Sequence, residues 1–104
     1  MNALLPDLQS AAIDPVRAER MGFAPAYMDM ATCQIHVACN ANGQATLHHS
    51  LEGLDPSFVW ARNRQGRAIV LKPSLRAGYV RGGFFYTLVA TSRALREWDT
   101  GAVD

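Results

Sequence analysis

The clearest pattern along the chain is an alternation of apolar and polar or small residues that begins at Thr32. The apolar members all have odd numbers: Cys33, Ile35, Val37 and Cys39. A period of two is typical of a half-buried strand. Odd-numbered apolar residues continue to Leu51 beyond the turn sequence NANG, so we predict a β-hairpin over residues 32–51.

The numbering also constrains the turn of this hairpin. Because the apolar residues of both strands must share one face, paired residues must sum to an even number. A two-residue turn at Asn42 and Gly43 would break that rule, so we expect a three- or five-residue loop or a bulge. The odd-numbered residues then face the core, and His36 and His48 lie together on the outer face.

A second hairpin is predicted over residues 58–72, where FVWAR and RAIVLK flank the turn NRQG. Gly66 suits the left-handed position that closes a four-residue turn. Pairing Arg62 with Arg67 would set Trp60 opposite Ile69 and leave both faces apolar, so we expect the pair to be largely covered.

Residues 58–66 also fit a second interpretation, a helix that Asp55 caps and Gly66 ends, with Pro56 in its first position. Aromatic and β-branched residues dominate the segment and favour the strand.

A third hairpin is predicted over residues 78–87, with Gly82 and Gly83 as a two-residue turn. This turn pairs Tyr79 with Tyr86 and Val80 with Phe85. The four residues on one face are Tyr79, Arg81, Phe84 and Tyr86.

Helices are expected on both sides of these hairpins. Asp14, Pro15 and Gly22 indicate a short helix near 15–21, and Thr87 can cap an amphipathic helix over about 88–99. Along the second helix, residues Leu88, Thr91, Leu95 and Trp98 recur at helical spacing. The segment 23–31, with a proline inside it, is expected to be a connector whose aromatic residues and methionines pack onto the domain.

Together these elements predict an α+β fold with an antiparallel sheet, open or barrel-like. We expect an N-terminal extension with a short helix over residues 1–30 and a β-rich domain with a C-terminal helix over 31–104. The length of 104 residues, with 49% hydrophobic and 18% charged residues, is ordinary for one globular unit.

Composition also bears on the cellular compartment. No apolar run reaches the roughly 18 residues of a membrane span, and the N-terminus has no basic start, so we expect a cytoplasmic protein without a membrane partner. Two cysteines are too few for a disulfide framework, and an extended strand would hold them too far apart for a bond. We therefore expect reduced, buried thiols.

Charge divides the chain more sharply than hydropathy does. Residues 1–55 carry two arginines against six carboxylates, whereas residues 56–96 carry eight cations and no acid. These eight are Arg62, Arg64, Arg67, Lys72, Arg76, Arg81, Arg93 and Arg96. Such asymmetry favours a surface that meets anions, although charge alone names no substrate.

Aromatic residues lie among these cations, as they do in proteins that stack unpaired bases. We therefore predict a non-catalytic module that binds a polyanion, most readily single-stranded or structured nucleic acid. The residues expected to bind it are Arg62, Arg64, Arg67, Lys72, Arg76, Tyr79, Arg81, Phe84 and Tyr86. Ordinary cross-strand packing of the rings and a solvated arginine turn are the alternative interpretations of the same residues.

Two other functions are left open by the sequence. A homodimer could pair the basic part of one copy with the acidic part of another, with apolar contacts from residues 21–30. A small enzyme or sensor for a phosphorylated metabolite would need a pocket near Arg62, Arg67 and Arg76.

Metal and catalytic sites have little support from the residue spacing. Zinc ligands would have to come from two cysteines and three histidines: Cys33, Cys39, His36, His48 and His49. On an extended strand His36 points away from both thiols, and no paired cysteine knuckle is present. The familiar nucleotide-binding and metalloprotease motifs are missing too. We expect no metal, no cofactor and no catalytic residue.

Overall fold

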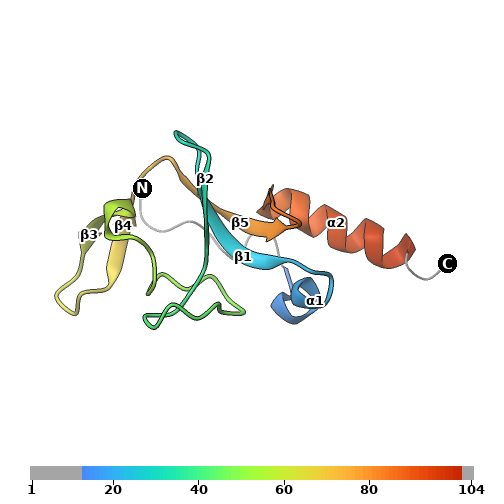
Figure 1. Ribbon diagram of the computed structural model, residues 1–104, viewed down its shortest axis with the longest axis horizontal. Coiled ribbons are helices and arrows are strands. Elements are labelled where there is room, and N and C mark those ends of the chain that lie inside the picture. Colours follow the sequence, from blue (N-terminus) through green and yellow to red (C-terminus); the bar gives the residue numbers. More distant parts are fainter. Residues whose placement is uncertain (1–12, 102–104) are drawn as a thin grey trace.

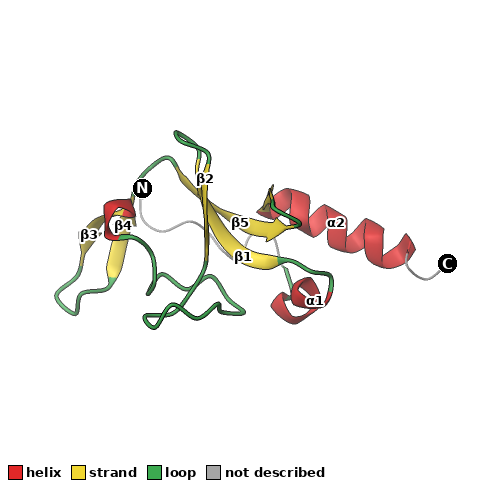
Figure 2. Ribbon diagram, in the orientation of Figure 1, coloured by secondary structure: helices red, strands yellow, loops and turns green. Residues whose placement is uncertain are grey.

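The computed structural model describes the backbone of residues 13–101 and the side chains of residues 13–98. It shows an α+β fold with two antiparallel sheets (Figure 1, Figure 2). The elements in chain order are α1 (Pro15–Arg20), β1 (Ala24–Asp29), β2 (Gln34–Val37), the 3₁₀ turn η1 (Pro56–Phe58), β3 (Val59–Arg62), β4 (Ala68–Leu71), β5 (Leu75–Arg81), β6 (Phe84–Thr87) and α2 (Leu88–Gly101). The four-stranded sheet has the order β2-β1-β5-β6, and β3 pairs with β4. Neither sheet closes, so the barrel-like alternative is wrong.

The four-stranded sheet separates two ends of the molecule. Figure 1 shows the β3–β4 hairpin at one end of the long axis and the two helices at the other. The hairpin-end core contains Tyr27, Ala38, Leu54, Phe58, Ala68, Leu71, Leu75 and Ala77. The helix-end core contains Ala18, Phe23, Tyr79, Ala94 and Leu95. Each end therefore has its own apolar cluster, and the sheet contributes to both.

Strand β1 lies in the middle of the large sheet, where the sequence predicted only a connector. Its second residue is Pro25, which lacks the N–H that a central strand normally donates. The Pro25 carbonyl still accepts from Ala38 N at 2.8 Å, and the Ala38 carbonyl accepts from Thr46 N at 3.2 Å. A third segment thus supplies the donor that Pro25 lacks. The expected packing of Phe23 and Tyr27 in the core is confirmed.

Strand β2 has the predicted period, but the opposite face is turned to the core. Tyr27 is buried and pairs with His36, so the even-numbered residues of β2 share the inner face. The His36 ring packs 4.6 Å from the Phe58 ring, whereas Ile35 and Val37 are exposed. The expected outer position of His36 is therefore wrong, because register with β1 decides the face.

The hairpin predicted over residues 32–51 forms only at its turn. Asn40 N donates to the Gln44 carbonyl at 2.9 Å, and a single bridge joins Cys39 to Ala45. These pairs enclose a three-residue loop, one of the predicted alternatives, and their numbers sum to an even value as expected. The predicted second strand of this hairpin is absent, because no strand lies between Ala45 and the turn η1. Strand β2 pairs with β1 instead.

The β3–β4 hairpin confirms the strand interpretation and the left-handed Gly66, whose φ is +81°. Of the alternative helix, only the first turn forms: the short 3₁₀ turn η1, which Asp55 caps and which precedes β3. Asn63 N donates to the Arg67 carbonyl at 2.9 Å, and Arg62 pairs with Ala68 rather than with Arg67. Bulges shift the register, so the predicted pairing is wrong. The pair is also less covered than predicted, because Trp60 is 62% exposed.

The β5–β6 hairpin and both helices follow the sequence prediction closely. Tyr79 pairs with Tyr86 and Val80 with Phe85 across the two-glycine turn. Thr87 Oγ1 accepts from the Ala90 amide at 3.1 Å, which caps the start of α2. Helix α1 begins after the predicted Asp14 cap. These elements form as predicted because neighbouring residues determine each turn and each helix cap.

Candidate functional site

The nine residues predicted to bind an anion fall into three groups. The β3–β4 turn region carries the first, the β4–β5 connection and the start of β5 carry the second, and the β5–β6 hairpin carries the third. In that order the members are Arg62, Arg64 and Arg67; Lys72 and Arg76; and Tyr79, Arg81, Phe84 and Tyr86. The first and third groups lie toward opposite ends of the long axis (Figure 1). They do not form one continuous surface.

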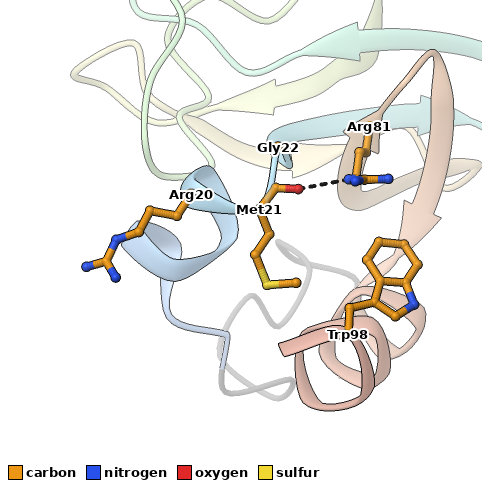
Figure 3. A pocket seen from close by; sticks show the side chains of 5 residues that line it. All are labelled: Arg20, Met21, Gly22, Arg81 and Trp98. Carbon is orange, nitrogen blue, oxygen red and sulfur yellow. Dashed lines mark hydrogen bonds between the residues drawn. The ribbon is translucent and has the colours of Figure 1, made fainter. Parts of the chain in front are cut away.

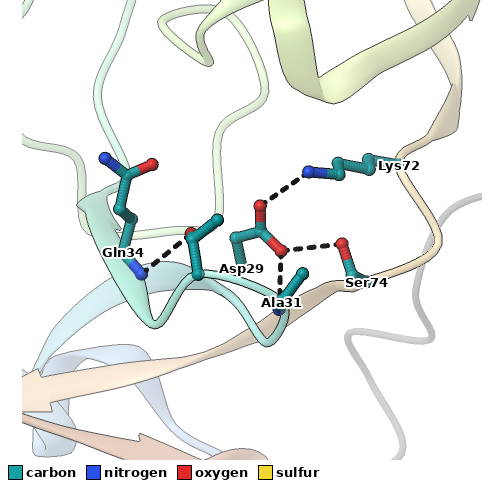
Figure 4. Close-up of polar contacts among 6 residues, drawn as sticks. Asp29, Ala31, Gln34, Lys72 and Ser74 are labelled. Atoms are coloured by element: carbon teal, nitrogen blue, oxygen red, sulfur yellow. Dashed lines mark hydrogen bonds and ion pairs between the residues drawn. The ribbon is translucent and has the colours of Figure 1, made fainter.

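Lys72 is engaged by a buried carboxylate. Its Nζ donates to Asp29 Oδ2 at 2.8 Å, while Ser74 Oγ and Ala31 N donate to Asp29 Oδ1 at 2.7 and 2.9 Å (Figure 4). Hydrogen bonds from Lys72, Ser74 and Ala31 hold the pKa of Asp29 well below its usual range. Lys72 therefore neutralises the buried Asp29 carboxylate, so little of its positive charge remains to attract an external anion.

Arg76 is exposed but folds back on the backbone. Its Nη1 donates to the Pro73 carbonyl at 2.6 Å and to the Leu75 carbonyl at 3.3 Å. Arg76 pairs with Met28 on the face of the sheet opposite Tyr27. Its charge is thus separated from the aromatic residues of the third group.

Tyr79 belongs to the helix-end core rather than to a surface platform. It is 4% exposed, and its ring lies 6.3 Å from Phe23 and 5.0 Å from His49. Burial raises its pKa. Tyr86 is half-buried beside Phe23, at 5.2 Å between ring centres. The predicted register is right, but α2 covers this part of the face, so Tyr79 cannot meet a ligand directly.

Arg81 is held at the edge of that cluster by two other elements, the turn after α1 and helix α2. Its Nε donates to the Met21 carbonyl at 2.8 Å (Figure 3), and its guanidinium lies 4.9 Å from the Trp98 ring centre. Gly22, with φ of +89°, has no side chain, and a Cβ there would stand 3.4 Å from Arg81 Nε. Glycine thereby lets the guanidinium lie close to the backbone of the turn after α1.

These residues line an open groove of about 670 Å³ that we call the aromatic groove: Arg20, Met21, Gly22, Arg81 and Trp98. The Arg20 guanidinium points away from Arg81 (Figure 3), so it lies at the rim of the groove. Only Arg81 among the predicted site residues lines this groove.

The indole of Trp98 is covered from one side. Its ring centre lies 5.7 Å from Phe23 and 4.9 Å from the Arg81 guanidinium, which itself lies 5.8 Å from Phe23. Groups on opposite faces of the indole would be much farther from each other, so both lie on one side. Trp98 keeps 38% of its surface exposed. At the nearby hairpin tip Phe84 is 71% exposed and pairs with Arg81.

Trp98 was not predicted as a site residue, although its position on one face of the C-terminal helix was predicted. Helical spacing put it on one face with Leu88 and Leu95, and the strand register put Arg81 on the face with Tyr79. Nothing local indicated that these two faces meet. The role of Gly22 and of the Met21 carbonyl had no signal in the sequence, because their partner lies 60 residues away.

A second hollow, which we call the hairpin cavity, lies between the β3–β4 hairpin and the preceding loop. Its volume is about 570 Å³, and its lining residues are Ala41, His49, Leu51, Glu52, Arg62, Gly66, Arg67 and Ala68. A pocket of the kind that a phosphorylated-metabolite site would need is thus present near Arg62 and Arg67, but Arg76 does not line it. Arg64 lies at the tip of the same turn and does not line it either.

His49 lines the hairpin cavity and is held in place by two rings and a hydrogen bond. Its ring lies 5.6 Å from Tyr27 and 5.0 Å from Tyr79, and its Nε2 donates to the Gly78 carbonyl at 2.6 Å. Burial lowers the pKa of His49, against the opposing effect of the Gly78 hydrogen bond. The ring is accordingly neutral at pH 7, and Nδ1 is the nitrogen that holds the lone pair.

The cysteines and remaining histidines do not converge. Both thiols are free, but Cys33 is exposed and Cys39 half-buried, so the expected burial is wrong. Cys33 sits in the turn before β2 with φ of +65°, outside the strand that was expected to bury it. Within the part of the chain that the structure describes, no three His, Cys, Asp or Glu side chains form a metal-binding group.

The apolar contact suggested for a homodimer is used inside the fold. Phe23 and Tyr27 are 2% and 1% exposed, so they are not available to a partner. Met30 is exposed at the end of β1.

No protein-family model, curated protein or solved structure matches this chain. Among the described residues, no helix is both long and apolar enough to cross a membrane. The two hollows are therefore the features of the molecule from which a function can be inferred.

Proposed function

We propose that the protein is a non-catalytic binding module that holds single-stranded nucleic acid at the aromatic groove. The observation that carries this proposal is the pairing of Arg81 with the partly exposed Trp98 in an open groove. A nucleotide presents a flat base and a phosphate a short distance apart. An indole binds the first by stacking, and a guanidinium binds the second by charge-assisted hydrogen bonds.

The arrangement is suited to binding because Arg81 is already positioned. Its Nε donates to the Met21 carbonyl, and among the described residues its two Nη groups make no hydrogen bond, so they can donate to a phosphate. An arginine fixed in this way loses less conformational entropy when it binds than one that moves freely. Phe84, exposed beside Arg81, offers a second ring to a neighbouring base.

Single strands fit this groove better than duplexes. The bases of a duplex are stacked on each other, so their faces are closed to an indole, whereas bases in single strands and loops are open. Each base stacked on an aromatic side chain contributes about 1–3 kcal/mol. One tryptophan and one phenylalanine therefore predict modest affinity.

The proposal is tested by fluorescence anisotropy with labelled oligothymidylate at about 50 mM salt. Trp98→Leu should weaken binding about tenfold or more, because one base loses its stacking surface. Trp60→Leu is the matched control, since Trp60 is exposed but lies in the β3–β4 hairpin. Equal losses in the two variants, or no binding by the unchanged protein, would overturn the proposal.

Salt provides a second test of the same groove. For single strands the logarithm of the affinity falls by about 0.7 for each tenfold rise in salt and each phosphate neutralised. Arg81→Gln should reduce this slope by about that amount. Arg93→Gln is the control, because Arg93 is exposed on α2 and does not line the groove. A slope that is unchanged in the Arg81 variant would show that Arg81 meets no phosphate.

A further inference from the structure

The hairpin cavity combines two arginines with hydrogen-bond acceptors, and none of its residues lines the aromatic groove. Its volume of about 570 Å³ lies in the range of small-molecule sites, about 300–1,000 Å³. Leu51, Ala41 and Ala68 supply apolar surface for the body of a ligand. The cavity is therefore a candidate site in its own right.

The cationic side of the cavity comes from the β3–β4 hairpin. Arg62 Nη1 donates to the Gly66 carbonyl at 2.8 Å, which fixes the guanidinium near the turn. The left-handed conformation of Gly66 positions that carbonyl. Asn63 Oδ1 accepts from the Arg67 amide at 2.9 Å and holds the other side of the turn. The turn thus fixes the Arg62 guanidinium and the Arg67 backbone, and both arginines line one cavity, which suits a carboxylate or a phosphate.

The acceptor side comes from the loop before η1. His49 donates from Nε2 to the Gly78 carbonyl, so its Nδ1 can only accept while the ring is neutral. Glu52, also in the lining, offers carboxylate oxygens that accept as well. A simple inorganic anion would satisfy the arginines but would leave these acceptors without donors.

We propose that the hairpin cavity binds a small organic anion that also carries a hydroxyl group. Arg62 and Arg67 hold its carboxylate or phosphate, and His49 and Glu52 accept hydrogen bonds from its donor group. This site is separate from the groove proposed for nucleic acid, so either proposal can fail without the other.

The test uses two pairs of compounds that differ only in hydroxyl groups: glycolate against acetate, and glycerol 3-phosphate against propyl phosphate. Side-chain NMR signals of Arg62, Arg67 and His49 are followed during each titration. At least one hydroxylated member should bind saturably and more tightly than its partner without a hydroxyl. The same titration should move the His49 Nδ1 resonance, because that nitrogen gains a hydrogen bond.

A pair of variants separates a specific site from general ionic attraction. Arg67→Gln should lower the affinity for the anion about tenfold, since a hydrogen bond to a charged group is lost. Arg64→Gln, in the same turn but outside the lining, should leave the affinity unchanged. Equal losses in both variants, no saturation with either hydroxylated anion, or equal affinity with and without the hydroxyl would overturn the proposal.

Discussion

The helix end and the hairpin end of this protein hold their arginines in different ways. At the helix end Arg81 is fixed by a carbonyl 60 residues away and by a ring of α2. At the hairpin end Arg62 is fixed by the Gly66 carbonyl, four residues away. One site is assembled from three separate elements, and the other depends on a local turn and the loop that faces it. Equal charges in a sequence can therefore belong to sites of very different construction.

Strand β5 connects the two ends, and we expect it to be the part of the fold most sensitive to substitution. Ala77 belongs to the hairpin-end core and Tyr79 to the helix-end core. Gly78 lies between them, and a Cβ there would collide with the Tyr86 carbonyl and the Phe85 ring. We expect Gly78→Ala to reduce the free energy of unfolding in urea by about 3 kcal/mol and to weaken both sites together.

Gly83→Ala is the control for this substitution. Gly83 has φ of +82° and open space around it, so alanine should cost only about 1 kcal/mol, through backbone strain. A Gly78 variant no less stable than the Gly83 variant would contradict the close packing at the junction.

A buried carboxylate makes the hairpin end sensitive to acid. The folded pKa of Asp29 is lowered from an ordinary value of 3.8, so the folded state binds fewer protons than the unfolded state just below that pH. Stability is then fully present above pH 3.8 and declines as the pH falls further. Asp29→Asn should flatten this decline in an acid titration followed by circular dichroism. An unchanged titration curve would show that Asp29 is not responsible.

His49 should add a dependence at milder pH. Burial lowers its folded pKa below the ordinary 6.5, so the unfolded state takes up more protons as the pH falls through that value. Stability should therefore decrease on going from neutral pH toward pH 5. His49→Gln should remove most of the difference in melting temperature between pH 7.5 and about 5.5. His48→Gln, at the exposed neighbour, should retain it.

The smallest expected effect compares the two ways of holding an arginine. Arg81→Gln should lower the free energy of unfolding by about 1 kcal/mol, because a hydrogen bond and a cation–π contact are lost. Arg62→Gln should cost about 0.5 kcal/mol, since its bond lies within an exposed turn. Chemical denaturation of both variants measures the difference. The reverse order would contradict the contrast between the two ends.

Local chemistry explains which parts of the fold could be predicted. The turn at Gly82 and Gly83, the Thr87 cap and the left-handed Gly66 are each determined by neighbouring residues, and all three are confirmed. The central position of β1 could not be predicted, because the Ala38 and Thr46 bonds that accommodate Pro25 come from distant segments.

The candidate site follows the same rule. Arg62 and Arg67 could be associated from the turn alone, whereas the cavity beside them could not be predicted, because its other wall comes from the loop around His49 and Glu52. Trp98 was recognised on its helix but could not be placed against Arg81, since that contact depends on how α2 packs on the sheet. The partners that engage Tyr79 and Lys72 in the structure, Phe23 and Asp29, could not be predicted, because they lie far away in the chain.

The most direct test of the aromatic groove is the fluorescence of Trp98 alone. In a Trp60→Phe background, oligothymidylate should quench the Trp98 emission saturably, with the same midpoint as the anisotropy titration, because a base stacks on the indole. In the reciprocal Trp98→Phe protein, the Trp60 emission should stay unchanged. Binding by anisotropy without a change at Trp98, or quenching confined to Trp60, would contradict the groove as the nucleic-acid site.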